Sequence, residues 1–170
     1  MQPKHPSDSR TIMTDMVLPS ETNPLNNLFG GELLARMDRC ASITAQRHSR
    51  RIVVTASVNH VAFNKAVPLG SVVTVEAAVS RAFKTSMEIF IDVWIEDRVS
   101  GLRSKANEAI YTFVAVDDTG TPTVVPELIP ETDLEKERFA AALRRKQLSL
   151  VLAGKMKAKN ATELRALFTD

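Results

Sequence analysis

The hydrophobic residues of this 170-residue chain change their spacing near residue 50, and this change constrains the fold more than any other feature. From residue 30 to about residue 46 they recur every three to four positions, which is typical of a helix with one buried face. Beyond residue 52 they recur at every second position, which is typical of strands with one core-facing side. The pattern therefore predicts one long helix followed by an antiparallel sheet.

The predicted helix is amphipathic. At about 100° per residue, its apolar residues fall on one arc and most of its charged residues fall opposite. The arc contains Leu33, Leu34, Met37, Cys40, Ala41, Thr44 and Ala45, and the opposite side contains Glu32, Arg36, Arg39 and Gln46. We expect the apolar side to be buried against the rest of the fold.

Five stretches of the chain favour β-strands. Four follow the helix, at residues 53–61, 73–79, 87–95 and 106–116, and a weaker one precedes it at residues 12–18. The breaks between them carry turn-forming residues such as Asp117-Asp118-Thr119-Gly120. Because a lone helix must bury its apolar face, we predict an α+β fold in which an antiparallel β-sheet wraps the long central helix.

Composition divides the chain into three parts. Residues 1–11 are polar, contain Pro3 and Pro6, and are predicted to be disordered. Residues 12–130 form the predicted domain, which ends in a proline-rich stretch. Residues 131–170 return to a helical pattern and are predicted to form a C-terminal helical extension. A second short helix is predicted to begin at Asn160, where Glu163 would complete a capping box.

Composition also disfavours several classes of protein. The net charge of +2 gives no strong case for a nucleic acid or a membrane as partner. No apolar run reaches the roughly 18 residues of a membrane span, and the N-terminus lacks the apolar core of a signal peptide. The single cysteine, Cys40, fits a reducing compartment, so a cytoplasmic location is expected. His48 and His60 lack zinc-ligand spacing, and no glycine motif for nucleotide phosphates occurs, so no metal or cofactor is expected.

Asp38 is the most informative polar residue, because it lies at the edge of the apolar arc. No cation stands three or four positions away on the helix. A half-buried carboxylate without a local partner costs free energy unless another part of the fold, or a second chain, satisfies it. Such a group is a candidate general base or nucleophile. The alternative is that Asp38 pairs with a distant arginine or faces water.

Two further candidates lie before and at the start of the helix. Gly30 and Gly31 would let a ligand approach the first backbone N–H groups, which have no intrahelical partner and can polarise a carbonyl as an oxyanion hole. Their alternative role is tight packing or capping. Asn23 could position a water or a carbonyl, although an asparagine before a proline is usually part of a turn.

The ordered set of motifs resembles the cytosolic acyl-CoA hydrolases of the hotdog superfamily, over about residues 16–126. The motifs are Pro19-Ser20-Glu21-Thr22-Asn23, Leu28-Phe29-Gly30-Gly31-Glu32-Leu33-Leu34 with Met37-Asp38, Val54-Thr55-Ala56-Ser57-Val58, Phe63 with Pro68-Leu69-Gly70, Thr85-Ser86-Met87-Glu88, and Thr112-Phe113-Val114-Ala115-Val116-Asp117. The resemblance implies a hotdog fold and an acyl-CoA thioesterase that releases a free fatty acid and coenzyme A.

The resemblance also implies site residues and partners. The catalytic aspartate of the family falls on Asp38, its active-site asparagine on Asn23, and its helix-start glycines on Gly30 and Gly31. Two protomers join their sheets edge to edge, two active sites form at the interface of this dimer, and three dimers commonly assemble into a hexamer. Coenzyme A, as part of the substrate, is expected to contact Phe63, Lys65, Arg81, Lys84, Thr85 and Ser86.

Two departures from the family pattern affect turns. Asn26 stands where many relatives have glycine, and asparagine tolerates the left-handed conformation better than most residues. Phe83-Lys84 stands where many relatives have Gly-Arg or Gly-Thr, which leaves the conformation of that turn and its coenzyme A contacts open.

Three alternatives to a thioesterase remain from sequence. A hotdog hydratase or dehydratase acting on acyl thioesters would usually place a histidine in the site, and the helix offers none before His48. A non-catalytic acyl-CoA-binding protein that acts as a sensor would normally need a DNA-binding segment, and no helix-turn-helix pattern precedes the domain. A structural module with no activity would leave the position of Asp38 unexplained. The preferred acyl length and the choice between general base and nucleophile are not readable from the sequence.

Overall fold

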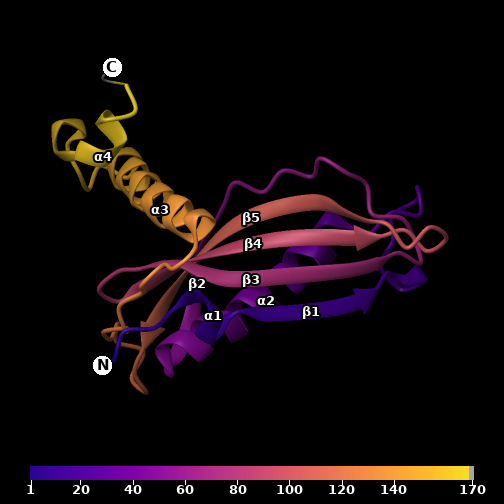
Figure 1. Cartoon of the computed structure of the whole chain (residues 1–170), viewed down its shortest axis with the longest axis horizontal. Coiled ribbons are helices and arrows are strands. Elements are labelled where there is room, and N and C mark those ends of the chain that lie inside the picture. The colour runs from indigo at the N-terminus through magenta and orange to yellow at the C-terminus, as the bar shows by residue number, and fades with distance from the viewer. Residues whose placement is uncertain (169–170) are drawn as a thin grey trace.

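The computed structural model describes residues 1–168 and contains a five-stranded antiparallel sheet curled around one long helix (Figure 1). The strand order is β1-β3-β4-β5-β2. The strands are β1 Thr11–Met16, β2 Ile52–Asn59, β3 Val72–Ala82, β4 Ser86–Glu96 and β5 Arg103–Val116, and the long helix is α2 Gly30–Ser49. This architecture confirms the predicted α+β hotdog fold.

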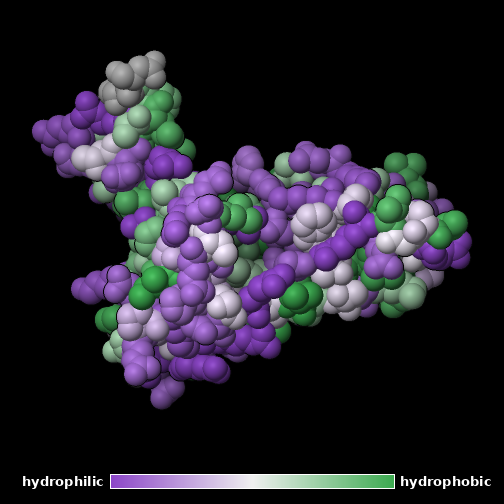
Figure 2. Space-filling model, viewed as in Figure 1, coloured by the Kyte–Doolittle hydropathy of each residue, from purple (hydrophilic) through white to green (hydrophobic). Residues whose placement is uncertain are grey.

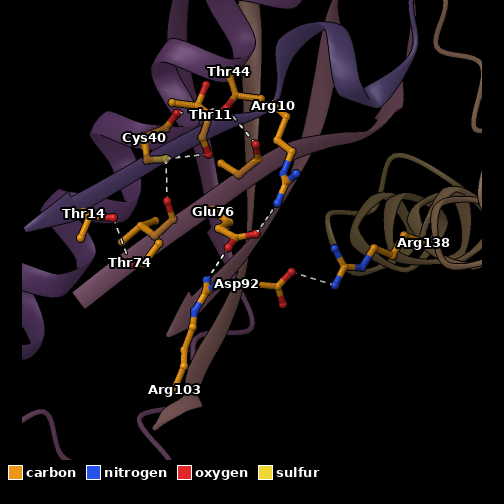
Figure 3. Close-up of polar contacts among 12 residues, drawn as sticks. Arg10, Thr11, Thr14, Cys40, Thr44, Thr74, Glu76, Asp92, Arg103 and Arg138 are labelled. Atoms are coloured by element: carbon orange, nitrogen blue, oxygen red, sulfur yellow. Dashed lines mark hydrogen bonds and ion pairs between the residues drawn. The ribbon is translucent and has the colours of Figure 1, made fainter. Parts of the chain in front are cut away.

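The helix α2 lies on one face of the sheet, and its apolar arc forms the centre of the core. Met37, Cys40, Ala41 and Ala45 are fully buried, as predicted. The Cys40 thiol lies 3.5 Å from the carbonyl oxygens of Thr11 and Val75, so the middle of α2 packs directly on β1 and β3 (Figure 3).

The strands show the predicted alternation. In β4 the residues Met87, Ile89, Ile91, Val93 and Ile95 face the core and are at most 8% exposed. Strand β2 differs, because it pairs only with β5 and most of its residues are exposed. Its exposed side chains include two apolar ones, Val54 at 48% and Val58 at 46% exposed. An exposed apolar edge strand of this kind is suited to pairing with another chain.

Arg36 contradicts the predicted division of the helix, since it is only 4% exposed. Its guanidinium donates to a carboxylate oxygen of Glu21 at 2.7 Å and to the carbonyl of Met16 at 3.0 Å. Glu21 lies in the short 3-10 helix η1 Pro19–Glu21. The loop before α2 therefore folds back over this side of the helix, which a helical wheel cannot show.

Residues 4–11 pack against the domain, although disorder was predicted for residues 1–11. The Lys4 ammonium donates to the carbonyls of Arg47 and His48 at 2.8 Å, which caps the C-terminal end of α2. The Lys4 backbone also pairs with residues 127–129. The short helix α1 Pro6–Ser9 contacts α2, and Ser9 is fully buried. These contacts supply the burial that a composition count misses.

The C-terminal extension begins with the helix α3 Asp133–Leu152, which starts over one end of the sheet and extends beyond it (Figure 1). Thr132 caps this helix in a capping box with Glu135. The second short helix, α4 Thr162–Arg165, starts two residues after the predicted Asn160 and lacks the predicted side-chain cap. A 3-10 turn, η2 Ala158–Asn160, occupies the predicted start instead.

Ion pairs attach α3 to the outer face of the sheet, the face opposite α2. Arg145 donates two hydrogen bonds to Glu88, which is 5% exposed, and Arg138 donates to Asp92 at 2.9 Å (Figure 3). Figure 2 shows that this outer face is largely hydrophilic, with apolar side chains gathered near the β4–β5 turn. The main core therefore lies on the α2 side, whereas Ile110 and Ala142 are buried on the α3 side.

Candidate functional site

Asp38 lies in the middle of α2 on the side that faces the edge strand β2, and it is half-buried. The hydroxyl of Thr55 on β2 donates a hydrogen bond of 2.8 Å to the carboxylate. No ion pair involves Asp38 within residues 1–168. The alternative of a permanent arginine partner within the chain is therefore wrong, and the second carboxylate oxygen is left for another group.

A small pocket of about 280 Å³ opens beside Asp38 and is lined by Leu34, Ala35, Val58 and Tyr111. The Tyr111 hydroxyl lies 3.2 Å from the carbonyl of Leu34 and donates to it. Burial, helped by the negative charge of Asp38, raises the pKa of Tyr111 to about 12. Tyr111 is therefore neutral at physiological pH, and it acts as a hydrogen-bond donor beside the carboxylate.

The start of α2 presents free backbone donors. The Phe29 N–H donates to Glu21 and the Leu33 N–H donates to Phe29. Three backbone N–H groups lie between these two, at Gly30, Gly31 and Glu32. None of the three has a hydrogen-bond partner in the described part of the chain. A methyl group at Gly30 would lie 3.2 Å from the Phe63 ring, whereas one at Gly31 would meet nothing within 4 Å. The donors are therefore accessible from the side of Gly31.

Asn23 occupies a turn before α2. Its side-chain oxygen accepts hydrogen bonds from the backbone N–H groups of Leu25 at 3.0 Å and Asn27 at 3.2 Å. Asn26, within this turn, has the predicted left-handed conformation with φ of 56°. The turn role of Asn23 is therefore real, and its amide nitrogen is the part that remains for a ligand.

The residues expected to contact coenzyme A fall into two groups at opposite ends of β4. Phe63 lies against Gly30, and Lys65 donates to Ser104 at 2.7 Å, so both lie near the start of α2. Arg81 and Ser86 instead contact α3. Arg81 donates to the Phe139 carbonyl and lies over its ring, and Ser86 accepts from Lys146 at 3.4 Å.

Lys84 and Thr85 lie between Arg81 and Ser86, and their backbone carbonyls accept hydrogen bonds from Val125 and Ala115. The Lys84 side chain is exposed. One chain therefore does not bring its two groups of predicted coenzyme A residues together.

Sequence reasoning missed Thr55 and Tyr111 as parts of the site. Thr55 lies 17 positions after Asp38 on a different element, so no helical or strand spacing links the two residues. The register of β2 against β5 places Thr55 beside Phe113 and Val58 beside Tyr111. Only the pairing of these strands beneath α2 reveals that these side chains meet.

Within residues 1–168, neither His48 nor His60 is hydrogen-bonded or ion-paired to Asp38. His48 is fully buried, and its ring contacts the carbonyl of Pro126 at 2.9 Å. His60 lies after β2 with a left-handed backbone, at φ of 51°. Within residues 1–168 no group of three acidic, histidine or cysteine side chains could hold a metal ion. In the same part of the chain no helix is both long and apolar enough to span a membrane.

Comparisons with known proteins agree with this geometry. The model of the thioesterase superfamily matches residues 25–102. An uncharacterized acyl-CoA thioester hydrolase of Bacillus subtilis (strain 168), YkhA, is 40% identical over 81% of this chain and 80% of its own length. A crystal structure of an apo-hexameric acyl-CoA thioesterase is 37% identical, with a TM-score of 0.87 over 90% of this chain and 98% of that chain.

An acyl-CoA hydrolase from Staphylococcus aureus is also similar. Its structure in complex with butyryl coenzyme A, coenzyme A and coenzyme A disulfide is 36% identical, with a TM-score of 0.82 over 96% of this chain and 98% of that chain. Structures of the same hydrolase exist with alanine in place of one aspartate, one asparagine or one threonine. The chain described here belongs to the acyl-CoA thioester hydrolases of the thioesterase superfamily.

Proposed function

We propose that this chain hydrolyses acyl-CoA to a free fatty acid and coenzyme A, with Asp38 as general base or nucleophile. The hydrogen bond between Thr55 and Asp38 carries this assignment. In the S. aureus hydrolase the replaced asparagine precedes the replaced aspartate by 15 positions, and the replaced threonine follows it by 17. Asn23, Asp38 and Thr55 have the same spacings here, which supports their assignment as one functional set.

The chemistry needs a donor for the thioester oxygen and a base or nucleophile for its carbon. The N–H groups at Gly30 and Gly31 carry the positive end of the α2 dipole and suit the developing oxyanion. Asp38 either takes a proton from the attacking water or attacks to form an anhydride that water then opens. In both routes the carbon–sulfur bond breaks, and coenzyme A leaves as a thiolate that takes up a proton.

One chain cannot complete this site alone. Asp38 stands eight residues after Gly30, which is about 12 Å along a helix at 1.5 Å per residue. Reacting groups must lie within about 3.5 Å. Gly31 and Asp38 are seven positions apart and lie on the same face of α2. A second, antiparallel copy joined at the free edge of β2 would bring Asp38 of one protomer to Gly31 of the other.

This reasoning favours a homo-oligomer built from dimers, and a trimer of dimers is the proposed assembly. The apolar exposed edge of β2 supports the dimer. The same pairing could bring the two groups of predicted coenzyme A residues together from different protomers. Phe63 and Lys65 of one protomer would then lie near the start of α2 in the shared site. We assign the reaction no cofactor beyond coenzyme A as part of the substrate. A cytoplasmic location stays a prediction.

The alternatives are less well supported. A hydratase or dehydratase needs a histidine near the acid, but His48 is buried against Pro126. A purely binding protein would have no use for a carboxylate oriented by Thr55 beside an open pocket.

Release of free thiol from acyl-CoA tests the proposal. Asp38→Asn should lower kcat by about 10³-fold or more, while melting temperature and oligomeric state stay unchanged. Asp118→Asn, which alters an exposed turn carboxylate, is the matched control. Normal turnover by the Asp38 variant would refute the assignment.

A mixing experiment tests the shared site. Asp38→Asn and Gly31→Val should each be inactive. When they are co-refolded, half of the dimers are mixed, and each mixed dimer has one site with both wild-type groups. Thiol release should then recover to about a quarter of the wild-type rate, as expected for a two-fold symmetric dimer. No recovery would show that Asp38 and Gly31 act within one chain.

A further inference from the structure

Asn107 is a buried polar residue that the proposed mechanism does not use. It lies on β5 opposite Val93 of β4, and only 3% of it is exposed. Neither its amide nitrogen nor its amide oxygen has a hydrogen-bond partner. A buried unsatisfied polar atom costs about 1–3 kcal/mol, and buried amides in native proteins are normally paired with protein, water or ligand.

The side chain of Asn107 points towards α2. Alternate residues of a strand face the same side, and Ala109, Tyr111 and Phe113 on this side are at most 1% exposed. Tyr111 reaches the Leu34 carbonyl on α2, which identifies the helix-facing side. Asn107 precedes Tyr111 by four residues on that side.

The position of Asn107 along the helix follows from strand direction. Contacts from Cys40 to Val75 and from Thr44 to Ala77 show that α2 runs in the same direction as β3. Strand β5 also runs this way, because β3 and β5 are both antiparallel to β4. At about 3.3 Å per strand residue, Asn107 lies about 13 Å from Tyr111, in the direction of the N-terminal end of α2.

The same end of α2 carries the free N–H groups of Gly30, Gly31 and Glu32. The segment after β2 covers this region, with Phe63 against Gly30 and Lys65 bonded to Ser104 near the start of β5. The uncapped helix end and the unpartnered amide of Asn107 therefore lie towards the same end of the sheet, which this segment crosses. A polar ligand at this end of the sheet would give both of them hydrogen-bond partners.

We propose that Asn107 determines substrate specificity by binding an oxygen substituent on the acyl group, close to the thioester. This inference rests on the proposed function, since it assumes that the thioester carbonyl binds at the start of α2. An acyl hydroxyl can donate to the amide oxygen and accept from the amide nitrogen, which satisfies both groups of Asn107 at once. The preferred substrates are therefore short 3-hydroxyacyl thioesters of coenzyme A.

A plain alkyl group in the same place would leave the amide unpaired. Sites built to hydrogen-bond a substrate group reject the analogue that lacks the group far more strongly than apolar pockets reject an extra one. The wild-type protein should therefore show a kcat/KM for 3-hydroxybutyryl-CoA at least about tenfold above that for butyryl-CoA.

The test compares both substrates in the wild-type protein and in Asn107→Leu, which has a similar volume. The variant should lose the preference, mainly through a fall of about tenfold or more in kcat/KM for the hydroxylated substrate. Asn107→Val serves if the leucine variant does not fold. Glu108→Gln changes the adjacent β5 residue, which faces the outer side, and should keep the wild-type preference.

A binding measurement separates this proposal from the proposed function. Dissociation constants are measured by calorimetry for ketone analogues in which a methylene replaces the thioester sulfur, with and without the 3-hydroxyl. A preference for the hydroxylated analogue that Asn107→Leu abolishes supports the inference even if neither thioester is hydrolysed. Equal affinities in the wild-type protein, or a preference that Asn107→Leu leaves intact, would overturn it and assign Asn107 a structural water only.

Discussion

The hydroxyl of Thr55 on the edge strand β2 and the carboxylate of Asp38 on the central helix are joined by a hydrogen bond of 2.8 Å. The bond holds one carboxylate oxygen, and within residues 1–168 the other has no hydrogen-bond partner, beside a pocket that Leu34 and Val58 also line. It therefore links the side chain of an edge-strand residue to the carboxylate that is proposed to act on the thioester.

Replacing Thr55 by valine should lower kcat about tenfold to a hundredfold, because the reacting oxygen loses its fixed orientation. KM should change little, since the hydroxyl contacts the carboxylate and not the substrate in the proposed site. Steady-state kinetics with one acyl-CoA measures both constants. Thr14→Val, which breaks an exposed threonine pair between β1 and β3, is the control. An unchanged kcat would remove Thr55 from the functional set.

The two helix-start glycines should respond differently to alanine. Gly31→Ala meets no atom within 4 Å in its own chain, so it should raise the free energy of unfolding by about 0.5–1 kcal/mol. It should nevertheless lower kcat/KM, because the added methyl group lies over the free N–H donors. Gly30→Ala places a methyl group 3.2 Å from the Phe63 ring, so the same gain in stability should be offset.

Urea titrations of the two alanine variants, together with thiol-release assays, give the comparison. Full activity in a stabilised Gly31→Ala would argue against an oxyanion hole at these amides.

His48 should make stability depend on pH. Burial lowers its pKa below the ordinary value of 6.5, so the folded protein holds His48 neutral. The unfolded chain then binds more protons than the folded chain at mildly acid pH. The stabilisation is complete above pH 6.5 and is lost as pH falls through the lowered pKa.

Melting temperatures measured from pH 7.5 to pH 5 should therefore fall with pH. His48→Gln, which retains a donor for the Pro126 carbonyl, should show a flatter profile. A wild-type profile that stays flat over this interval would show that His48 is not held neutral.

The C-terminal extension should depend on the pair between Arg145 and Glu88. Glu88 is 5% exposed, and Ser80 also donates to it at 2.6 Å. Arg145→Met would leave this carboxylate buried without its cation, at a cost of about 3 kcal/mol. Denaturant unfolding and limited proteolysis at the α3 junction should both report the loss.

The double variant Glu88→Gln with Arg145→Met should recover most of the lost stability. Arg144→Met, the neighbouring change, should have little effect. If Arg145→Met is as stable as the wild-type protein, this ion pair does not hold α3.

The sequence predicted the fold well because the decisive signals are local. The helical spacing around Met37 and the alternation around Ile91 each arise within one element, and burial follows directly from them. The left-handed backbone of Asn26 could likewise be predicted from its residue type, because asparagine adopts this conformation more readily than most residues. In contrast, Arg36 is buried because the loop before the helix folds back and places Glu21 against it. No residue pattern within the helix predicts this contact.

The candidate site could be predicted only in part for the same reason. Asp38 stood out because its own helix gives it no partner. Its partner Thr55 comes 17 positions later on β2, and the two residues meet only because β2 pairs with β5 beside α2. Lys4 shows the same effect in the N-terminal segment, where contacts with α2 outweigh a composition typical of disorder.

The free edge of β2 has a consequence for how the protein responds to dilution. If catalysis requires two copies that meet at this edge, the separated monomers are inactive. The turnover measured per molecule would then rise in proportion to protein concentration until pairing saturates, and assays at nanomolar protein would understate what the same molecules do inside a crowded cell.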